Sequence, residues 1–308
     1  MLASMYRQTL LGVANNPAVE KLAKTQGWKL GVRRFVAGET FEEALPSLQE
    51  LEENKLSPIL DLLGEFVDTE AGAQEMVDAI LMTLDKLSAT TLDKYMSVKP
   101  TQLGLGVSLD LALKNARRIL DKAREVGAHI CLDMENVPFV DGTLDLLETL
   151  ISEGYENVST VLQSYLKRTP ADLARLLRLE PTPSVRIVKG AYKESAEHAY
   201  QDIADVNAAY RELLWQAFDA GAHVNVATHD ESIISEVIAY VRGANLGVER
   251  YEFQFLFGVK PKLQTRLVEE GHTVRIYVPY GEDWYGYFSR RLAERPANLM
   301  FVVRGLMG

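Results

Sequence analysis

The sequence predicts an α/β fold: a (β/α)8 barrel, with a helical extension before it and a final helix over its C-terminal mouth. Three observations support this prediction. The chain has 308 residues, which is long for an ordinary domain but normal for an α/β barrel. Eight short apolar segments alternate with helical stretches, and such alternation builds a parallel sheet. Apolar residues make up 47% of the chain, which is enough for a large core.

The eight predicted strands are rich in Val, Ile, Leu, Tyr or Phe, as buried strands are. They cover residues 57–63, 94–99, 128–134, 157–163, 184–190, 223–229, 250–256 and 273–279. The predicted helices cover residues 68–90, 108–127, 141–154, 170–178, 195–221, 231–245, 260–271 and, after the eighth strand, 283–295. Two helix starts carry recognisable signals. Thr169 precedes Pro170 at a first helical position, and Asp230 can cap the helix that follows it.

The predicted domain organisation is simple. Residues 1–50 precede the first strand and have a helical pattern, so we expect an N-terminal extension packed on the barrel. Residues 57–308 then form the barrel itself. The sequence shows no low-complexity linker, and we therefore predict a single domain over residues 1–308.

Composition restricts the possible functions. The net charge is −10 and the isoelectric point is about 5.2, which argues against a nucleic-acid-binding protein because such proteins need a basic face. The single cysteine, Cys131, lies in the middle of a predicted strand, where it reads as a small core residue. No stretch approaches the roughly 20 apolar residues of a membrane-spanning helix. We expect a cytoplasmic protein, with peripheral contact to a membrane left open.

Polar residues end nearly every predicted strand. In a barrel of this kind the chemistry is placed at the C-terminal ends of the strands. A single polar residue there could be an ordinary start of a loop, but a converging ring of two lysines and several carboxylates predicts a site for a small zwitterionic or polar molecule. The ring comprises Asp61, Glu65, Lys99, Asp133, Glu135, Gln163, Lys189, Thr228, His229, Gln254 and Tyr277.

Common cofactor motifs do not explain this ring. The stretch GLGVSL at 104–109 is half a glycine fingerprint without a strand directly before it, so it does not indicate a dinucleotide-binding loop. Only His229 among the histidines ends a strand, and we expect no metal site. Two other interpretations stay open at this point. One is a Schiff-base barrel, such as an aldolase, with Lys99 or Lys189 as nucleophile. The other is a barrel that binds or scaffolds without catalysis.

Nine stretches, in order along the chain, resemble the proline dehydrogenase family of flavin-dependent barrels. The family resemblance is carried by DLLGE (61–65), SVK (97–99), LDME (132–135), VLQSYLKRT (161–169), RIVKGAY (186–192), ATHD (227–230), EFQFLFG (252–258), RIYVPYG (275–281) and YFSRRLAER (287–295). No fragment alone is diagnostic, whereas the ordered set is specific. The length of the chain resembles the stand-alone bacterial form of the family.

The resemblance implies a reaction. The family oxidises L-proline to Δ1-pyrroline-5-carboxylate: FAD accepts a hydride from the substrate, and a membrane quinone then takes the electrons. A pyrroline-5-carboxylate dehydrogenase would take the product. By resemblance, Arg290, Arg291 and Lys99 hold the proline carboxylate, since guanidinium groups make bidentate contacts to carboxylates. Glu65 would pair with Arg290 and gate the pocket, and Glu294 would support the arginines.

The resemblance also assigns the remaining site residues. Asp133 and Arg186 would be the catalytic pair, and Asp133 could also form an ion pair with Lys99 on the neighbouring strand. Arg186 would lie beside the reactive edge of the flavin, where a cation stabilises the negative charge of the reduced ring. The wall of the proline pocket would comprise Tyr192, Leu256 and Tyr277. The FAD-binding residues would be Met134, Gln163, Arg186, Val188, Lys189, Gly190, Ala191, Thr228 and His229.

Overall fold

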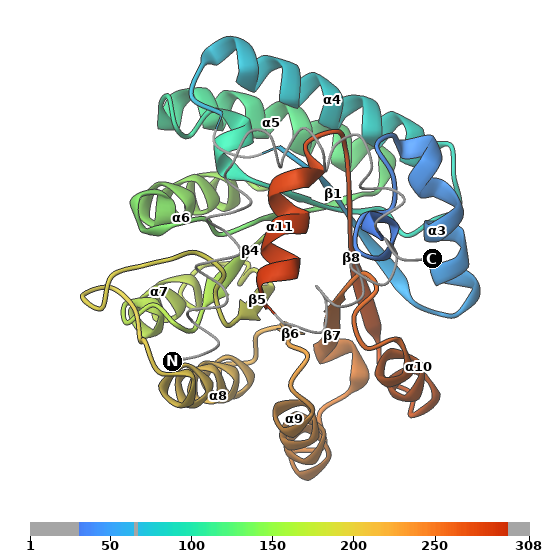
Figure 1. The fold of residues 1–308 in the computed structure, drawn as a ribbon. Helices are drawn as coiled ribbons and strands as arrows, with labels where there is room; N and C mark the ends of the chain where they lie inside the picture. Colours follow the sequence, from blue (N-terminus) through green and yellow to red (C-terminus); the bar gives the residue numbers. More distant parts are fainter. Residues whose placement is uncertain (1–30, 65–66, 295–308) are drawn as a thin grey trace.

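The fold is a closed barrel of eight parallel strands that pair in chain order, as the computed structural model shows (Figure 1). The structure describes residues 31–64 and 67–294. The last strand closes on the first along six paired residues, from Ser57 opposite Arg275 to Leu62 opposite Tyr280. The predicted fold class is therefore confirmed. The strands are β1 Ser57–Leu62, β2 Tyr95–Val98, β3 His129–Leu132, β4 Val158–Gln163, β5 Val185–Val188, β6 Val224–Ala227, β7 Tyr251–Leu256 and β8 Val274–Tyr280.

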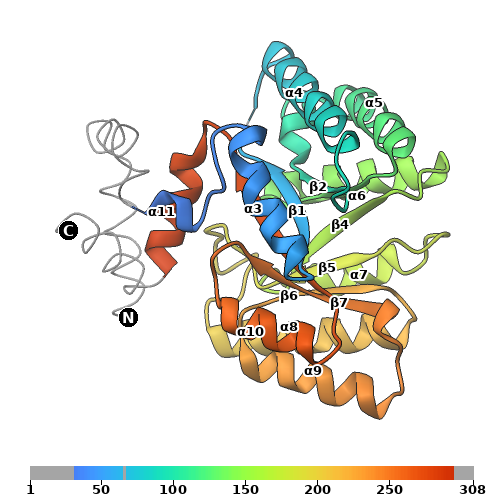
Figure 2. The same cartoon turned by 90° about the vertical axis from the view of Figure 1, so that its right-hand side faces the viewer.

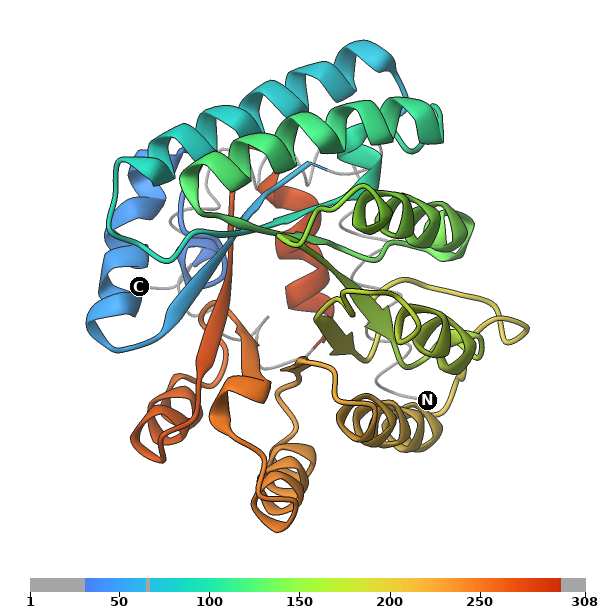
Figure 3. The ribbon, with the colours of Figure 1, turned by 180° about the vertical axis from the view of Figure 1, so that it is seen from behind.

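Helices surround the barrel and cover the outer faces of its strands (Figures 1 and 3). Each buries an apolar stripe against the sheet. In the helix Leu109–Val126, for example, the side chain of Ser108 accepts a hydrogen bond from the N–H of Leu111, and Gly127 ends the helix in a left-handed conformation. The helices that follow β1 to β7 are α4 Glu70–Ser88, α5 Leu109–Val126, α6 Val137–Ser152, α7 Thr169–Leu176, α8 Ile203–Asp219, α9 Glu231–Gly243 and α10 Pro261–Glu269.

Two helix starts differ from the sequence prediction by four residues or more, and the others lie within two residues of it. Helix α8 begins at Ile203 and not at residue 195, because the side chain of Asp202 accepts a hydrogen bond from Ala204 N–H and caps the helix there. The residues before it form a loop, whose Ala199 makes an antiparallel bridge with Leu166. Helix α6 begins at Val137 and not at 141, and α7 begins at Thr169, one residue before its proline. Proline is well tolerated in the first turn of both helices.

The wall of the barrel between β8 and β1 is covered by a helix that comes before the barrel in the chain. Helix α3 (Phe41–Glu53) contacts both of these strands, and it begins where Thr40 accepts a hydrogen bond from Glu43 N–H. Because α3 occupies this place, helix α11 (Trp284–Glu294), which follows β8, lies over one end of the barrel (Figure 2). The expected helical extension is seen here for residues 41–50, whereas residues 1–30 lie outside the described residues.

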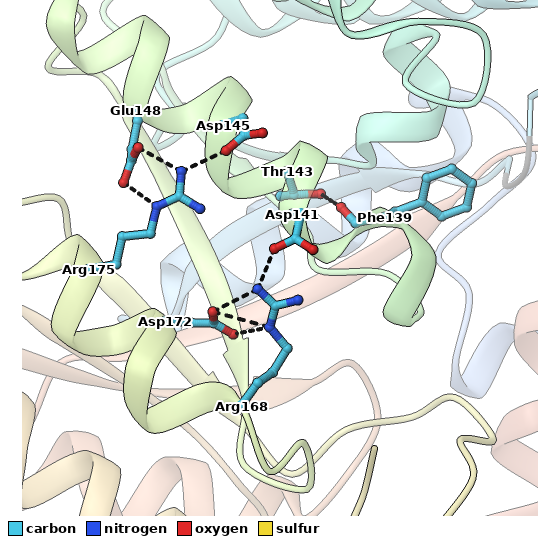
Figure 4. A network of polar contacts seen from close by, with 8 residues as sticks. All are labelled: Phe139, Asp141, Thr143, Asp145, Glu148, Arg168, Asp172 and Arg175. Atoms are coloured by element: carbon cyan, nitrogen blue, oxygen red, sulfur yellow. Dashed lines mark hydrogen bonds and ion pairs between the residues drawn. The ribbon is translucent and has the colours of Figure 1, made fainter. Parts of the chain in front are cut away.

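Two arginines join α6 to α7 at the exit of β4 (Figure 4). Arg175 pairs with Glu148 at 2.5 Å and with Asp145 at 2.7 Å. Arg168 pairs with Asp172 at 2.9 Å and also with Asp141. These linked pairs hold the start of α7 against α6. That start matters for the site because the hydroxyl of Thr169 donates to the carbonyl of Gln163, the last residue of β4, at 2.6 Å.

The barrel interior is polar near the N-terminal ends of β2, β3 and β4. His129, Tyr95 and Ser159 meet there, although they come from three different strands. The Nε2 atom of His129 lies 2.8 Å from Ser159 Oγ, which is in turn 3.3 Å from the hydroxyl of Tyr95. Burial and the nearby Arg275 and Arg186 lower the pKa of His129 to about 4. The folded protein therefore holds this imidazole neutral.

The low pKa of His129 predicts a loss of stability in mild acid. The unfolded chain binds a proton on this residue near its ordinary pKa of about 6.5, whereas the folded protein binds it only near 4. Stability is therefore lost as the pH falls from 6.5 towards 4. Between pH 7 and pH 4.5, the free energy of unfolding of His129→Gln should fall by about 2–3 kcal/mol less than that of the wild type, as measured by urea unfolding. The matched control is His198→Gln, at an exposed position, which should follow the wild type.

Candidate active site

A buried ion pair joins the ends of the first two strands. The Nζ atom of Lys99 lies 2.8 Å from Asp61 Oδ1, and the two residues are 5% and 1% exposed. Burial raises the pKa of Asp61, and the charge of Lys99 opposes this shift. Asp133 was expected as a possible partner of Lys99, but the ion pair that the structure shows is with Asp61, whereas the oxygens of Asp133 accept hydrogen bonds from Arg186 and Tyr277. Lys99 thus presents its charge at the mouth with Asp61 beneath it.

Asp133 is the centre of a second cluster, which joins β3, β5, β2 and β8. Its Oδ1 atom accepts a hydrogen bond from Arg186 Nη1 at 2.8 Å, and its Oδ2 atom accepts one from the hydroxyl of Tyr277 at 2.6 Å. Arg186 Nη1 also donates to Ser97 Oγ at 3.0 Å, and its guanidinium lies 5.5 Å from the centre of the Tyr277 ring. Burial and the charge of Asp133 raise the pKa of Tyr277 well above its ordinary value, so the phenol remains a donor.

The guanidinium of Arg186 keeps donor capacity that the protein does not use. Arg186 is 4% exposed. Its Nε and Nη2 atoms are buried and have no hydrogen-bond partner in the part of the chain that the structure describes. Buried donors of a charged group are rarely left in this state, because the loss of hydration is costly. The arrangement is suited to an acceptor supplied by a bound molecule.

Two buried side chains, Gln102 and Glu135, hold the segments that follow the strands in place through hydrogen bonds. Gln102 is 1% exposed and bonds to both neighbouring strand exits: Nε2 donates to the carbonyls of Leu62 and Gly64, and Oε1 accepts from Lys99 N–H, all within 2.7–2.8 Å. Glu135, which is fully buried, accepts from the backbone and the hydroxyl of Thr101. The predicted flavin ligand Gln163 lies beside Glu135 and donates to its carbonyl at 2.8 Å.

The exit of β5 is an open stretch of backbone. Val188 and Lys189 are partly buried, and Gly190 and Ala191 are exposed. Gly190 has φ +114°, and a Cβ there would lie 2.2 Å from the ring of Tyr165, so the chain can follow this path only with glycine. Lys189 is held at 3.1 Å by Asp230, the residue that caps α9. Gly190 and Ala191 therefore expose their backbone at the place where the family resemblance puts the cofactor.

The exits of β6 and β7 lie next to this run. The hydroxyl of Thr228 accepts from Asp230 N–H at 3.2 Å. His229 Nε2 accepts from Leu256 N–H at 3.1 Å, which assigns the ring proton to Nδ1. Of the other predicted residues, Met134 is buried two residues after β3, Tyr192 is partly buried in the loop after β5, and Leu256 is the partly buried last residue of β7.

Helix α11 carries the arginine doublet, Arg290 and Arg291 (Figure 1). It crosses the end of the barrel, as the side view in Figure 2 also shows. Arg291 is 8% exposed, and its guanidinium lies 5.2 Å from the centre of the Tyr287 ring one turn earlier. Arg290 is partly buried. The two side chains differ in exposure, as expected for successive helix positions. Glu65 and the side chain of Glu294 lie outside the described residues, so their predicted pairing with the doublet stays a prediction.

The structure does not favour the Schiff-base interpretation. Both candidate nucleophiles, Lys99 and Lys189, are bound to carboxylates, at 2.8 Å and 3.1 Å. A nucleophilic lysine needs a neighbour that favours its neutral form, and a carboxylate favours the ammonium. Among residues 31–64 and 67–294, no cluster of three or more His, Cys, Asp or Glu side chains is arranged to hold a metal ion. No helix in this part of the chain is long and apolar enough to cross a membrane.

Three supporting residues escaped the sequence prediction. Ser97 and Gln102 were not assigned a role, and Asp61 was noted only as a polar strand end. Ser97 lies within a strand, on the same face as Tyr95 and Lys99, and this period of two is the one signal that could have identified it. Gln102 follows Pro100 in a short 3-10 helix, Pro100–Leu103, and no pattern in the sequence announces that its side chain turns back to the strand ends.

Comparison with known proteins gives a consistent result. A family model described as proline dehydrogenase matches residues 44–304. The chain is 47% identical to the proline dehydrogenase of Deinococcus radiodurans, over 100% of this chain and 99% of that relative. It is 36% identical to proline dehydrogenase 1 of Bacillus subtilis, over 98% and 99%. Its fold is similar to proline utilization A of Bdellovibrio bacteriovorus inactivated by N-propargylglycine, with a TM-score of 0.82 and 24% identity. That alignment covers 94% of this chain, which spans 36% of the solved protein.

The three hydrogen bonds of Gln102 predict a large loss of stability for Gln102→Leu. Leucine has a similar size but leaves one N–H and two carbonyls buried without partners, and each costs on the order of 1–3 kcal/mol. We expect urea unfolding to show a loss of about 3 kcal/mol or more. The control, Gln216→Leu at an exposed position of α8, should change stability by less than about 0.5 kcal/mol. Equal effects at both positions would contradict the assigned role.

Proposed function

Because the chain belongs to the proline dehydrogenase family, we propose that it oxidises L-proline to Δ1-pyrroline-5-carboxylate, the first step of proline catabolism. One observation supports this function above the others. A helix that carries Arg290 and Arg291 crosses the end of the barrel (Figure 1), and the Lys99–Asp61 pair and the Asp133 cluster lie at or near the C-terminal ends of the strands. We infer that the two arginines bind a small carboxylate above Arg186, a buried cation whose Nε and Nη2 donors have no partner among the described residues.

The residues at the strand exits suit FAD as the cofactor. The unused Nε and Nη2 donors of Arg186 provide a cationic contact for an electron-rich ring, and the exposed backbone at Gly190 and Ala191 permits close approach. When bound, FAD would supply the hydride acceptor. We propose that Arg186 and Gln163 hold the isoalloxazine ring, that Thr228 and His229 contact the nucleotide half, and that the remaining contacts come from Met134, Val188, Lys189, Gly190 and Ala191.

The substrate carboxylate is held by charge and the ring by shape. Arg290 and Arg291 bind the carboxylate from above, and Lys99 adds a third positive group, fixed in direction by Asp61. The rings of Tyr192 and Tyr277 and the side chain of Leu256 form the wall around the five-membered ring. Tyr277 keeps its place because its hydroxyl donates to Asp133. Glu65 and Glu294 are proposed to pair with the doublet, Glu65 as the gate.

The chemical role of Asp133 is to fix two groups in place. It orients Arg186 under the flavin site and Tyr277 beside the substrate, and it partly balances the buried positive charge. Asp133 also remains protected from bulk water, with its side chain 14% exposed. The chain's own residues thus bind the carboxylate, orient the ring and exclude water, which are the contributions that a protein makes to hydride transfer by a bound cofactor.

Family membership alone supports the wider setting of the reaction. We propose a membrane quinone as the electron acceptor and a pyrroline-5-carboxylate dehydrogenase as the enzyme that takes the product. We further propose a cytoplasmic protein with peripheral membrane contact, in which residues 1–50 and the barrel, residues 57–308, act as a single domain.

The colour of the purified protein tests the proposed function. We expect yellow protein with the two absorption bands of an oxidised flavin, bleached by L-proline without air and restored by a soluble quinone. L-Lactate, a carboxylate without the ring nitrogen, should leave the bands unchanged. Colourless protein that does not bind added FAD would exclude the proposal.

Replacement of Arg291 tests the carboxylate assignment. Arg291→Lys keeps the positive charge but loses the planar fork that contacts both carboxylate oxygens. We expect the KM for proline to rise by about tenfold or more, equivalent to roughly 1.4 kcal/mol, while flavin content stays unchanged. The control is Arg178→Lys, at an exposed position after α7, which should keep the wild-type KM. An unchanged KM in Arg291→Lys would show that another residue binds the carboxylate.

A further inference from the structure

Helix α11 packs on a small apolar cluster that is separate from the barrel core. The buried members of this cluster come from three parts of the chain: the segment before α3, the exit of β1, and α11 itself. They are Val32, Phe35, Val36, Leu63, Trp284, Tyr287 and Phe288. We call residues 32–39, which contribute Val32, Phe35 and Val36 to this cluster, the α11 seat. Burial of these side chains fixes the helix to the seat.

The α11 seat is itself attached to the strand exits. Ala37 N–H donates to the carbonyl of Pro279 at 2.9 Å, and Gly281 N–H donates to the carbonyl of Gly38 at 3.0 Å. On the other side, Gly258, with φ +74°, passes so close to Arg34 that a Cβ would lie 1.8 Å from the Arg34 carbonyl oxygen. The seat is therefore held against the ends of β7 and β8, and its position is tied to that of the site.

One hydrogen bond joins the seat to the first turn of α11. The indole Nε1 of Trp284, the first residue of the helix, donates to Glu39 Oε1 at 3.0 Å. Trp284 is 1% exposed and has the largest of the fully buried side chains described. Its ring also meets Phe288 one turn later in an edge-to-face contact, with 5.9 Å between ring centres. The start of the helix is thus fixed by shape and by a directional bond.

The geometry points to a positioning role for Glu39 and Trp284: we propose that their hydrogen bond sets the direction of α11 and so places Arg290 and Arg291 over the substrate carboxylate. Arg291 lies seven residues beyond Trp284, about 10 Å along the helix axis. A tilt of about 10° at the seat therefore moves the doublet by about 2 Å, enough to spoil bidentate contact. The identity of the ligand rests on the proposed function, whereas the role of the seat does not.

Steady-state kinetics with L-proline test this role. Glu39→Ala and Trp284→Phe each remove one partner of the hydrogen bond. Each should raise the KM for proline by about threefold to tenfold, the range expected for one lost hydrogen bond, with kcat within about twofold and flavin content unchanged. The increase in KM in the double variant should be smaller than the product of the two single increases, because both changes remove the same bond. Glu39→Gln keeps the acceptor oxygen and should retain the wild-type KM.

Two control variants distinguish an effect of the seat on the KM for proline from a general effect of substitution. Glu42→Ala removes a carboxylate three residues away that pairs with Lys86 on the protein surface. Trp215→Phe changes a tryptophan of helix α8 that stacks on Tyr240 of helix α9. Both should keep the wild-type KM. An unchanged KM in Glu39→Ala and Trp284→Phe, or a loss of flavin in both, would overturn the positioning role.

Hydrogen exchange tests the seat without any substrate. In Glu39→Ala and Trp284→Phe, the amides of residues 285–294 should exchange faster than in the wild type, while those of α5 should not change. Failure of the wild type to oxidise proline, together with faster exchange in the variants, would reject the proposed function and keep the seat. Unchanged exchange in an active enzyme would reject the seat and leave the function in place.

Discussion

The carboxylate of Asp133 is the group on which the geometry of the site depends. It accepts hydrogen bonds from residues of two other strands, Arg186 on β5 and Tyr277 on β8, and so connects distant parts of the barrel. A guanidinium with 4% exposure needs a carboxylate, since an isolated charge in the interior is very unfavourable. Asp133 balances that charge but contacts only one of the three nitrogens in the described structure, which leaves Arg186 able to bind a further group.

The second constraint is the space above the strand ends. A helix that follows β8 would ordinarily return along the outer wall and pack between β8 and β1. Here α3 lies in that place, and α11 turns over the mouth instead. The barrel thereby gains a cover made of its own chain. The proposed function places the cations of α11 on one side of the substrate and Lys99 and the Asp133 cluster on the other.

The sequence was sufficient to predict the architecture, because each strand is short and apolar and is followed by a helical stretch, two of which begin with recognisable signals. It was also sufficient to bring Lys99, Asp133 and Tyr277 to one end of the barrel, since they lie at or near the ends of parallel strands, whereas Arg186 was identified only by the family resemblance. It did not predict which charges pair. Lys99 selects Asp61 and not Asp133, a choice that depends on side-chain directions across the barrel and not on the order of the strands. Nor could any local pattern predict that Gln102 returns to the exits of β1 and β2, or that Trp284 reaches Glu39.

The bond between Trp284 and Glu39 joins residues 245 positions apart. During synthesis, the seat leaves the ribosome before the first strand of the barrel, whereas its partner helix emerges only after the eighth strand. The seat's apolar side chains must therefore stay solvent-exposed, or be covered by other means, until almost the whole chain has been made. The same order makes α11, with its two arginines, one of the last described elements to be synthesised. If these arginines bind the substrate as proposed, the capacity to bind it is acquired in one late step, when α11 packs on the seat.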